Sequence, residues 1–159
     1  MNLAIVGATG NVGRKLIEVL EKKKISITKV HLVASSKSVG KKIIFSGEDH
    51  IVEDLETFDF SKVKIAFFAA VSAVAEKWGP KDAKNTIVID NSKYFRKDHE
   101  IPLIVPEVNS NELSKFKNKN IIANANCSVI PIVVALKPLH DLYNVKRIVA
   151  STYQSVSGV

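Results

Sequence analysis

The stretch GATGNVG, from Gly7 to Gly13, constrains the fold of this chain more than any other. It follows the short apolar run NLAIV and precedes GRKLIEVLEKK, in which apolar residues recur at helical spacing. Glycines at these three positions allow a tight turn, and free N–H groups at a helix start can hold a pyrophosphate. The pattern therefore predicts a strand, turn and helix that bind a dinucleotide through Gly7, Thr9, Gly10, Asn11, Val12 and Gly13.

Further apolar runs alternate with helical patterns along the chain. We predict strands at residues 2–7, 29–35, 50–55, 63–70, 86–90 and 120–124, and helices at 13–23, from Ser72, within 109–116 and after Asn126. Strands that alternate with helices indicate a mainly parallel sheet covered on both faces. The sequence thus predicts an α/β fold with a doubly wound sheet, and 159 residues suffice for one such domain.

The turn after the second strand, VASSKSVGKK, is expected to select the dinucleotide. In NAD-binding folds a carboxylate at this place grips the ribose hydroxyls, but no acid occurs here. Ser35, Ser36, Lys37 and Ser38 instead offer hydroxyls and a cation suited to a 2′-phosphate. We therefore expect NADP, with a plain polar surface turn as the alternative.

The single cysteine, Cys127, lies in NANCSVIPIVVALKPLH after a predicted strand. A helix N-terminus lowers the pKa of a thiol by offering partial positive charge and N–H donors. Asn126 is a suitable N-cap, and Pro131 requires the helix to begin shortly before it. Because ligands gather at the carboxyl ends of parallel strands, Cys127 is predicted to be a nucleophile beside the dinucleotide, although a free cysteine can equally be a buried packing residue.

Charge and hydropathy exclude other classes of function. The net charge of +7 comes from lysines scattered over turns and helix ends without interleaved aromatic residues, so no nucleic-acid partner is expected. No apolar run reaches the length of a membrane span, and the N-terminus resembles no secretory signal. We therefore expect a cytoplasmic protein without a membrane or metal partner.

Several blocks together resemble the N-terminal half of the aspartate-β-semialdehyde dehydrogenase family, and they extend over nearly the whole chain. They are VGATGNVG, VASSKSVGKK, VIDNSKYFR, PLIVPEVN, NANCS, VALKPLHD and STYQSVSG. The resemblance implies a Rossmann-like NADP-binding domain over residues 1–145. It implies that residues 146–159 are the first strand of a second α+β domain, and that the chain is truncated before the rest of that domain. It further implies a homodimer for the full-length enzyme.

The resemblance also implies roles for individual residues. Cys127 would be acylated by β-aspartyl phosphate, Asn126 would lie in the active site, and Gln154 would orient the acyl intermediate. Arg96 would bind the substrate phosphate or carboxylate. Ser72 is expected to cap its helix and to contact the cofactor. The implied reaction reduces β-aspartyl phosphate to aspartate semialdehyde with NADPH, in the synthesis of lysine, threonine, methionine and diaminopimelate.

The sequence departs from the family at several places. Lys37 replaces an arginine, Val71, Ala73 and Val74 replace small or hydroxyl residues, Lys93 replaces a small hydroxyl residue, and NANC replaces CPNC or NPNC. None of the four histidines matches the family's acid–base motif, so this chain alone is expected to be inactive. Two alternatives remain: an N-acetyl-γ-glutamyl-phosphate reductase-like enzyme, whose cysteine would be flanked by glycine and tyrosine, and a non-catalytic nucleotide-binding module.

Overall fold

The computed structural model describes residues 1–23 and 25–153, and its main element is a seven-stranded parallel sheet. The sheet has the order β5-β2-β1-β6-β7-β9-β8. Its strands are β1 (Asn2–Val6), β2 (Lys29–Ala34), β5 (Glu53–Asp54), β6 (Ile65–Phe68), β7 (Ile87–Asp90), β8 (Leu103–Ile104) and β9 (Ile121–Asn124). A hairpin of β3 (Lys42–Phe45) and β4 (Glu48–Ile51) is antiparallel. The chain leaves β1 first toward β2 and then toward β6, so the strand order reverses beside β1, as in dinucleotide-binding folds.

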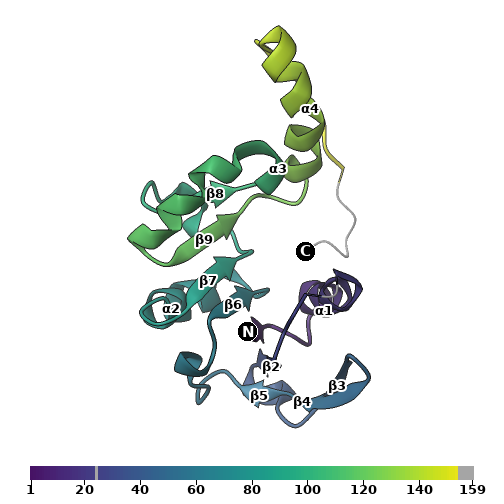
Figure 1. Ribbon diagram of the computed structural model, residues 1–159, viewed down its shortest axis with the longest axis vertical. Coiled ribbons are helices and arrows are strands. Elements are labelled where there is room, and N and C mark those ends of the chain that lie inside the picture. Colours follow the sequence, from purple (N-terminus) through teal and green to yellow (C-terminus); the bar gives the residue numbers. More distant parts are fainter. Residues whose placement is uncertain (24, 154–159) are drawn as a thin grey trace.

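Two helices cover opposite faces of the sheet, and Figure 1 shows them on either side of the strands. The helix α1 (Asn11–Lys23) places Ile17 and Leu20 on the face of Leu3 and Ile5. The helix α2 (Ser72–Asp82) packs Trp78 on the other face, in the core that contains Phe68. Because side chains alternate along a strand, the continuous apolar runs supply both layers. The predicted doubly wound α/β fold is confirmed.

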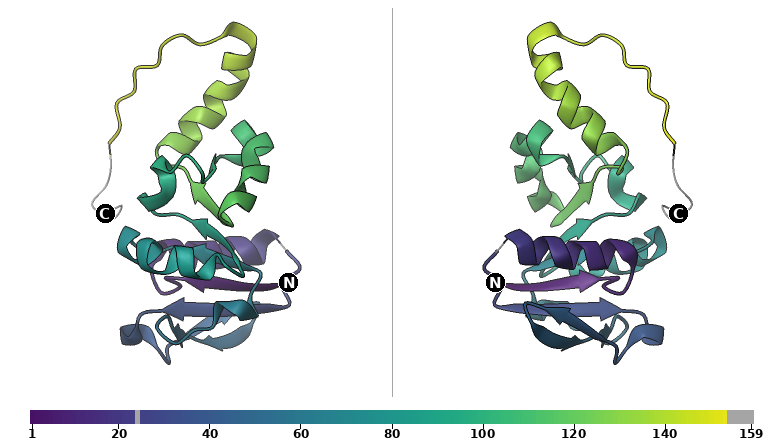
Figure 2. Two further views of the ribbon diagram at one scale, coloured as in Figure 1. Left: turned by 90° about the vertical axis from the view of Figure 1, so that its left-hand side faces the viewer. Right: turned by 90° about the vertical axis from the view of Figure 1, so that its right-hand side faces the viewer.

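The remaining helices and 3₁₀ turns lie in the connections between the strands and after β9. They are α3 (Pro106–Asn109) and α4 (Val129–Tyr143), with 3₁₀ turns η1 (Ser36–Ser38), η2 (Phe60–Lys62), η3 (Tyr94–Lys97) and η4 (Ser110–Asn118). The α4 helix rises from the sheet edge, and the residues after it return as extended chain (Figure 2). None of the helices within residues 1–23 and 25–153 is long and apolar enough to cross a membrane.

Three local predictions need correction. The segment 109–116, predicted as a helix, is the end of α3 followed by the 3₁₀ turn η4. Ser72 is the first residue of α2 and makes no capping hydrogen bond, because Val71 occupies the N-cap position. Residues 146–153 form no strand, since a strand requires a hydrogen-bonded neighbour and none lies beside them within the described residues. Their assignment to a second domain stays a prediction.

Candidate active site

The glycine turn is held tightly between β1, β6 and α1. Gly7 has a φ of 83°, and its N–H donates to the carbonyl of Val33 at 2.8 Å. A Cβ at Gly7 would come within 2.4 Å of the Ala69 carbonyl oxygen, and one at Gly13 within 2.3 Å of the Gly7 carbonyl oxygen. Glycine is therefore required at both positions by the close approach of the backbone.

The start of α1 leaves hydrogen-bond donors open to a ligand. Among the described residues, no acceptor contacts the N–H groups of Asn11, Val12 and Gly13, whereas the Arg14 N–H donates to the Gly10 carbonyl at 2.9 Å. Three free donors at a helix start, where the peptide dipoles add partial positive charge, suit an anion such as a pyrophosphate.

The turn after β2 lies against the glycine turn. Ser35, Ser36 and Lys37 are exposed on and beside η1, while Ser38 is buried. The hydroxyl of Thr9 lies 3.4 Å from that of Ser38, so the two turns are joined through these side chains. Ser38 was expected to offer a hydroxyl to the cofactor together with its three neighbours, but its side chain is buried and its hydroxyl lies against Thr9.

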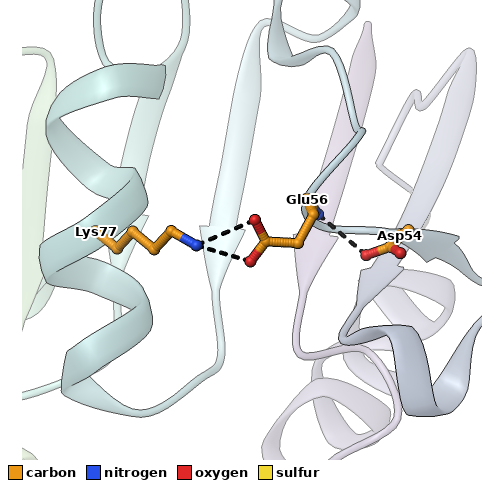
Figure 3. A network of polar contacts seen from close by, with 3 residues as sticks. All are labelled: Asp54, Glu56 and Lys77. Carbon is orange, nitrogen blue, oxygen red and sulfur yellow. Dashed lines mark hydrogen bonds and ion pairs between the residues drawn. The ribbon is translucent and has the colours of Figure 1, made fainter.

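The acids nearest to this turn along β5 are occupied by their own neighbours. Asp54 stands opposite Ala34 in the parallel pair of β2 and β5. Figure 3 shows its carboxylate accepting from the N–H of Glu56 at 3.0 Å, while the Glu56 carboxylate accepts from Lys77 of α2 at 2.8 and 3.0 Å. The pair of Glu56 and Lys77 is exposed and contributes little to stability. The Lys77 ammonium nevertheless balances part of the negative charge of Asp54 and Glu56 beside β5.

The cysteine lies where the chain passes from β9 into α4. Cys127 is exposed. The carbonyl of Asn126 accepts from the N–H groups of Val129 and Ile130 at 2.9 and 3.0 Å, and its side-chain oxygen accepts from the N–H of Ser128 at 2.8 Å. The predicted N-cap is wrong by two residues, because α4 begins at Val129 and its N-cap is Ser128; the Asn126 side chain closes the turn before the helix instead. Cys127 lies in the turn just before this N-cap, and its Sγ is 4.0 Å from the hydroxyl oxygen of Ser128.

Arg96 is fixed by the carboxyl ends of two strands. Its Nε donates to the carbonyl of Asn124, the last residue of β9, at 2.9 Å, and its Nη2 donates to the carbonyl of Asn91, just after β7, at 3.0 Å. Among the described residues no acceptor contacts Nη1. The half-buried guanidinium is therefore oriented rigidly and keeps donors for an anion.

A buried carboxyl group supports the turn that carries Arg96. Asp90 is fully buried at the end of β7 and accepts from the N–H and the hydroxyl of Ser92 at 3.1 and 2.7 Å. The Ser92 hydroxyl accepts in turn from the N–H of Tyr94 at 3.1 Å. Burial raises the pKa of Asp90, and the hydrogen bonds from Ser92 and the nearby Arg96 oppose this rise only in part. The sequence alone does not mark Asp90 as part of the site, because its burial depends on the strands that flank β7.

One hollow of about 510 Å³ brings the predicted groups together. It is lined by Asn11 and Val12 of the glycine turn, by Arg96, by Asn126 and Cys127, and by Lys15, Asn91, Asn124, Ala125 and Ile130. Thr9, Ser35, Ser36, Lys37 and Ser72 do not line it. Gln154 lies outside the described residues. A cofactor on the glycine turn would therefore reach the thiol and the guanidinium through one continuous hollow.

Other groups stand apart from this hollow. A larger one of about 770 Å³, between the end of α2 and η4, contains none of the predicted site residues, so size does not identify the site. None of the four histidines lines the hollow beside Cys127. One of them, His31, is buried on β2 with its Nδ1 2.7 Å from Glu53 Oε1.

Comparison with known proteins assigns the family. The family described as "Semialdehyde dehydrogenase, NAD binding domain" matches residues 2–116. This chain belongs to that family. It therefore has a dinucleotide-binding domain of the semialdehyde dehydrogenase type, as its fold and glycine turn indicate.

The relatives share one name. The aspartate-semialdehyde dehydrogenases of Rickettsia conorii and Vibrio cholerae (enzyme 2) are 49% and 48% identical over 99% of this chain. The chain spans about half the length of these curated relatives, 47% of each. A crystal structure of aspartate semialdehyde dehydrogenase II from Vibrio cholerae complexed with ASA matches with a TM-score of 0.87 at 47% identity, over 88% of this chain and 46% of the other. The Candida albicans enzyme with NADP matches with a TM-score of 0.67 at 27% identity, over 89% of this chain and 47% of the other.

Proposed function

We propose that this chain forms the cofactor-binding and nucleophile-bearing half of an aspartate-semialdehyde dehydrogenase. The observation that carries the proposal is the hollow that joins the glycine turn, Arg96 and Cys127. The names of the relatives favour the aspartyl over the acetylglutamyl reductase. The exposed thiol and the guanidinium with free donors favour an enzyme over a nucleotide-binding module without chemistry.

The residues of the hollow suit acyl transfer to sulfur. The thiolate of Cys127 attacks the acyl carbon of β-aspartyl phosphate, the carbon–oxygen bond to phosphate breaks, and inorganic phosphate leaves with the electron pair. Arg96 stabilises the charge on the anionic groups through its free N–H donors. The thioester that remains on Cys127 accepts hydride more readily than a carboxylate, and NADPH supplies that hydride when bound. The resulting thiohemiacetal releases the semialdehyde and restores the thiolate.

The proposed cofactor is NADP, and the turn after β2 is its proposed selector. The glycine turn leaves room only for backbone at Gly7 and Gly13, as close approach of a pyrophosphate requires. Lys37 and two serine hydroxyls are exposed where the adenosine ribose lies in this fold, and residues 35–41 contain no acid. We expect Lys37→Glu to reverse the order of NADP and NAD affinities in a fluorescence titration. Equal affinities in both proteins would contradict this selector.

Acylation of Cys127 tests the nucleophile without a complete enzyme. We expect the chain to react with acetyl phosphate, used as a simple acyl phosphate, to give a hydroxylamine-sensitive adduct on Cys127 by mass spectrometry. The rate should exceed that of glutathione at the same pH at least about tenfold, because Arg96 and the helix start stabilise the developing charge. Cys127→Ser should give no adduct. A rate equal to that of glutathione would remove the proposed role of the site.

The whole reaction requires groups beyond this hollow. No described histidine lines it, and a thiohemiacetal needs proton transfer to form and collapse. We therefore propose that residues 1–145 form the cofactor domain, that 146–159 lead into the second domain, and that the 159-residue chain alone does not turn over the semialdehyde. We also propose a homodimer for the full-length enzyme.

A further inference from the structure

The larger hollow, of about 770 Å³, lies on the α2 side of the sheet. It opens between the carboxyl end of α2, the turn η3 and the start of β9. Among the described residues, it has no lining residue in common with the hollow that contains the thiol. We call it the α2 hollow and define it by Lys84, Phe95, Asp98, Lys119 and Ile121, which line it. Its volume is in the range of about 300–1,000 Å³ that is usual for small-molecule sites.

Contacts between distant segments hold the walls of the α2 hollow in place. The side chain of Asn120, the residue before β9, donates to the carbonyl of Ala83 at 3.0 Å and so joins this strand to the end of α2. The ring of Phe95 packs directly on α2, because a Cβ at Gly79 would come within 2.9 Å of two of its carbon atoms. The hollow is therefore preformed in the folded domain, as most small-molecule sites are.

The floor of the α2 hollow is apolar. Phe95, Ile101 and Ile121 line it and belong to the core on this face of the sheet. The ring of Tyr94, a residue that is 43% exposed, stands nearly perpendicular to the ring of Phe95, with 4.9 Å between the two centroids. An apolar or aromatic group on this floor would exchange contact with water for contact with these side chains.

The rim of the α2 hollow carries charges of both signs. Lys119 Nζ lies 3.1 Å from Asp98 Oδ2 and 2.7 Å from Glu100 Oε2, and Lys84 is exposed just after α2. The side chains of Lys119 and Asp98 remain 37% and 33% exposed. An ammonium has three donors and a carboxylate about four acceptor positions, so this pair keeps positions for a ligand. The rim can therefore bind a carboxylate through its lysines and an ammonium through its acid.

A free amino acid carries an ammonium, a carboxylate and a side chain in one small molecule, which matches this lining. We propose that the α2 hollow binds a free amino acid with an apolar or aromatic side chain, its carboxylate at Lys84, its ammonium at Asp98 and its side chain on Phe95. The occupant rests on η3, the same turn that carries Arg96. This site is separate from the proposed cofactor and substrate site, and the inference does not depend on the chemistry assigned to the thiol.

Amide NMR of the isotope-labelled 159-residue chain tests the site, with L-phenylalanine as the probe. We expect saturable shifts at the amides of Lys84, Tyr94 and Lys119, and none at Gly13 or Cys127. Phenylpropanoate lacks the ammonium, phenylethylamine lacks the carboxylate and L-alanine lacks the ring, so each should bind at least about tenfold more weakly. NADP should not displace the probe, because the two hollows are lined by different described residues.

Two substitutions at the rim and one matched control locate the probe. Lys84→Met and Asp98→Asn remove the proposed partners of the carboxylate and the ammonium, and each should weaken binding of L-phenylalanine at least about tenfold. Lys117→Met removes an exposed lysine of η4 that does not line the α2 hollow, and the affinity should stay the same. Thermal melting checks that each variant keeps the fold.

The proposal is wrong if L-phenylalanine causes no saturable shifts. Equal affinities for the probe and its three analogues would show that the charges of the rim and the apolar floor do not select the ligand. Shifts centred on Cys127, or shifts that disappear when NADP is added, would place the probe in the other hollow. Unchanged binding in both Lys84→Met and Asp98→Asn would likewise exclude this site.

Discussion

The substitution Gly13→Ala tests how tightly the glycine turn is packed. A Cβ at Gly13 would lie 2.3 Å from the Gly7 carbonyl oxygen, 2.8 Å from the Ala8 Cα and 2.9 Å from the Gly7 carbonyl carbon. All three atoms are backbone, so the turn must move away from α1. Overpacking of this kind costs about 1–3 kcal/mol, and the forced backbone movement places the substitution at the upper end. Alanine returns up to about 1 kcal/mol of helix propensity, so we expect a net loss of about 2 kcal/mol in the free energy of unfolding.

Urea denaturation and thermal melting measure this loss. For a chain of this size, 2 kcal/mol corresponds to a fall of about 4–8 °C in melting temperature. The same shift of the turn should weaken NADP binding at least about tenfold, because it displaces the N–H donors at the start of α1.

The matched control is Gly10→Ala in the same turn. There the Cβ would meet only the Gly7 carbonyl oxygen at 3.4 Å, and φ is not positive, so the stability should change by less than about 0.5 kcal/mol. Equal stabilities of the two alanine variants would show that the close approach at Gly13 does not constrain the turn.

Three further substitutions test the carboxyl edge of the sheet. Arg96→Lys loses the two carbonyl contacts that orient the guanidinium, so acylation by acetyl phosphate should slow about tenfold while NADP affinity stays the same; weakened NADP binding would place Arg96 elsewhere. Asn126→Ala removes the hydrogen bond from the Ser128 N–H and should lower the free energy of unfolding by about 1 kcal/mol in urea denaturation; an unchanged value would show that this bond does not stabilise the turn before α4. Burial raises the pKa of Asp90 in the folded protein above its ordinary value of 3.8. The protonated carboxyl therefore adds to the stability of the folded protein fully below pH 3.8, and this contribution is lost as the pH rises through the raised pKa. Relative to Asp90→Asn, the parent should therefore lose stability with rising pH, and a difference that does not change with pH would contradict the raised pKa.

The sheet and the glycine turn could be predicted because their signals are local. Each strand predicted at residues 2–7, 29–35, 63–70, 86–90 and 120–124 appears within two residues of its place, since short apolar runs bounded by turn residues fit a buried parallel strand. The glycine turn could be predicted as well, because Gly7 and Gly13 lie too close to neighbouring backbone for any Cβ. The run 50–55 was less clear and divides between the hairpin strand β4 and the short edge strand β5.

The rest of the site depends on contacts between residues that are far apart in the sequence, and no local pattern indicates these contacts. Asp90 is buried only because β6 and β9 flank its strand, and Arg96 is oriented by the carbonyl of Asn124, 28 positions later. Over a segment as short as η4, a 3₁₀ turn and an α-helix show the same spacing of apolar residues, so the sequence cannot distinguish them. Residues 146–153 have the composition of a strand, but composition cannot supply the partner that a strand needs.

The central place of β1 also affects how the chain folds during synthesis. β1 pairs with β2 on one side and β6 on the other, and β6 ends only at Phe68. Within the described part of the chain, β3 and β4 form the one antiparallel pair, so every other pairing closes a long loop first. A nascent chain that has not yet released β6 from the ribosome therefore leaves one edge of its central strand open. We expect nascent chains in that interval to be recognised by chaperones that bind exposed strand edges, and to lose this recognition once Phe68 has emerged.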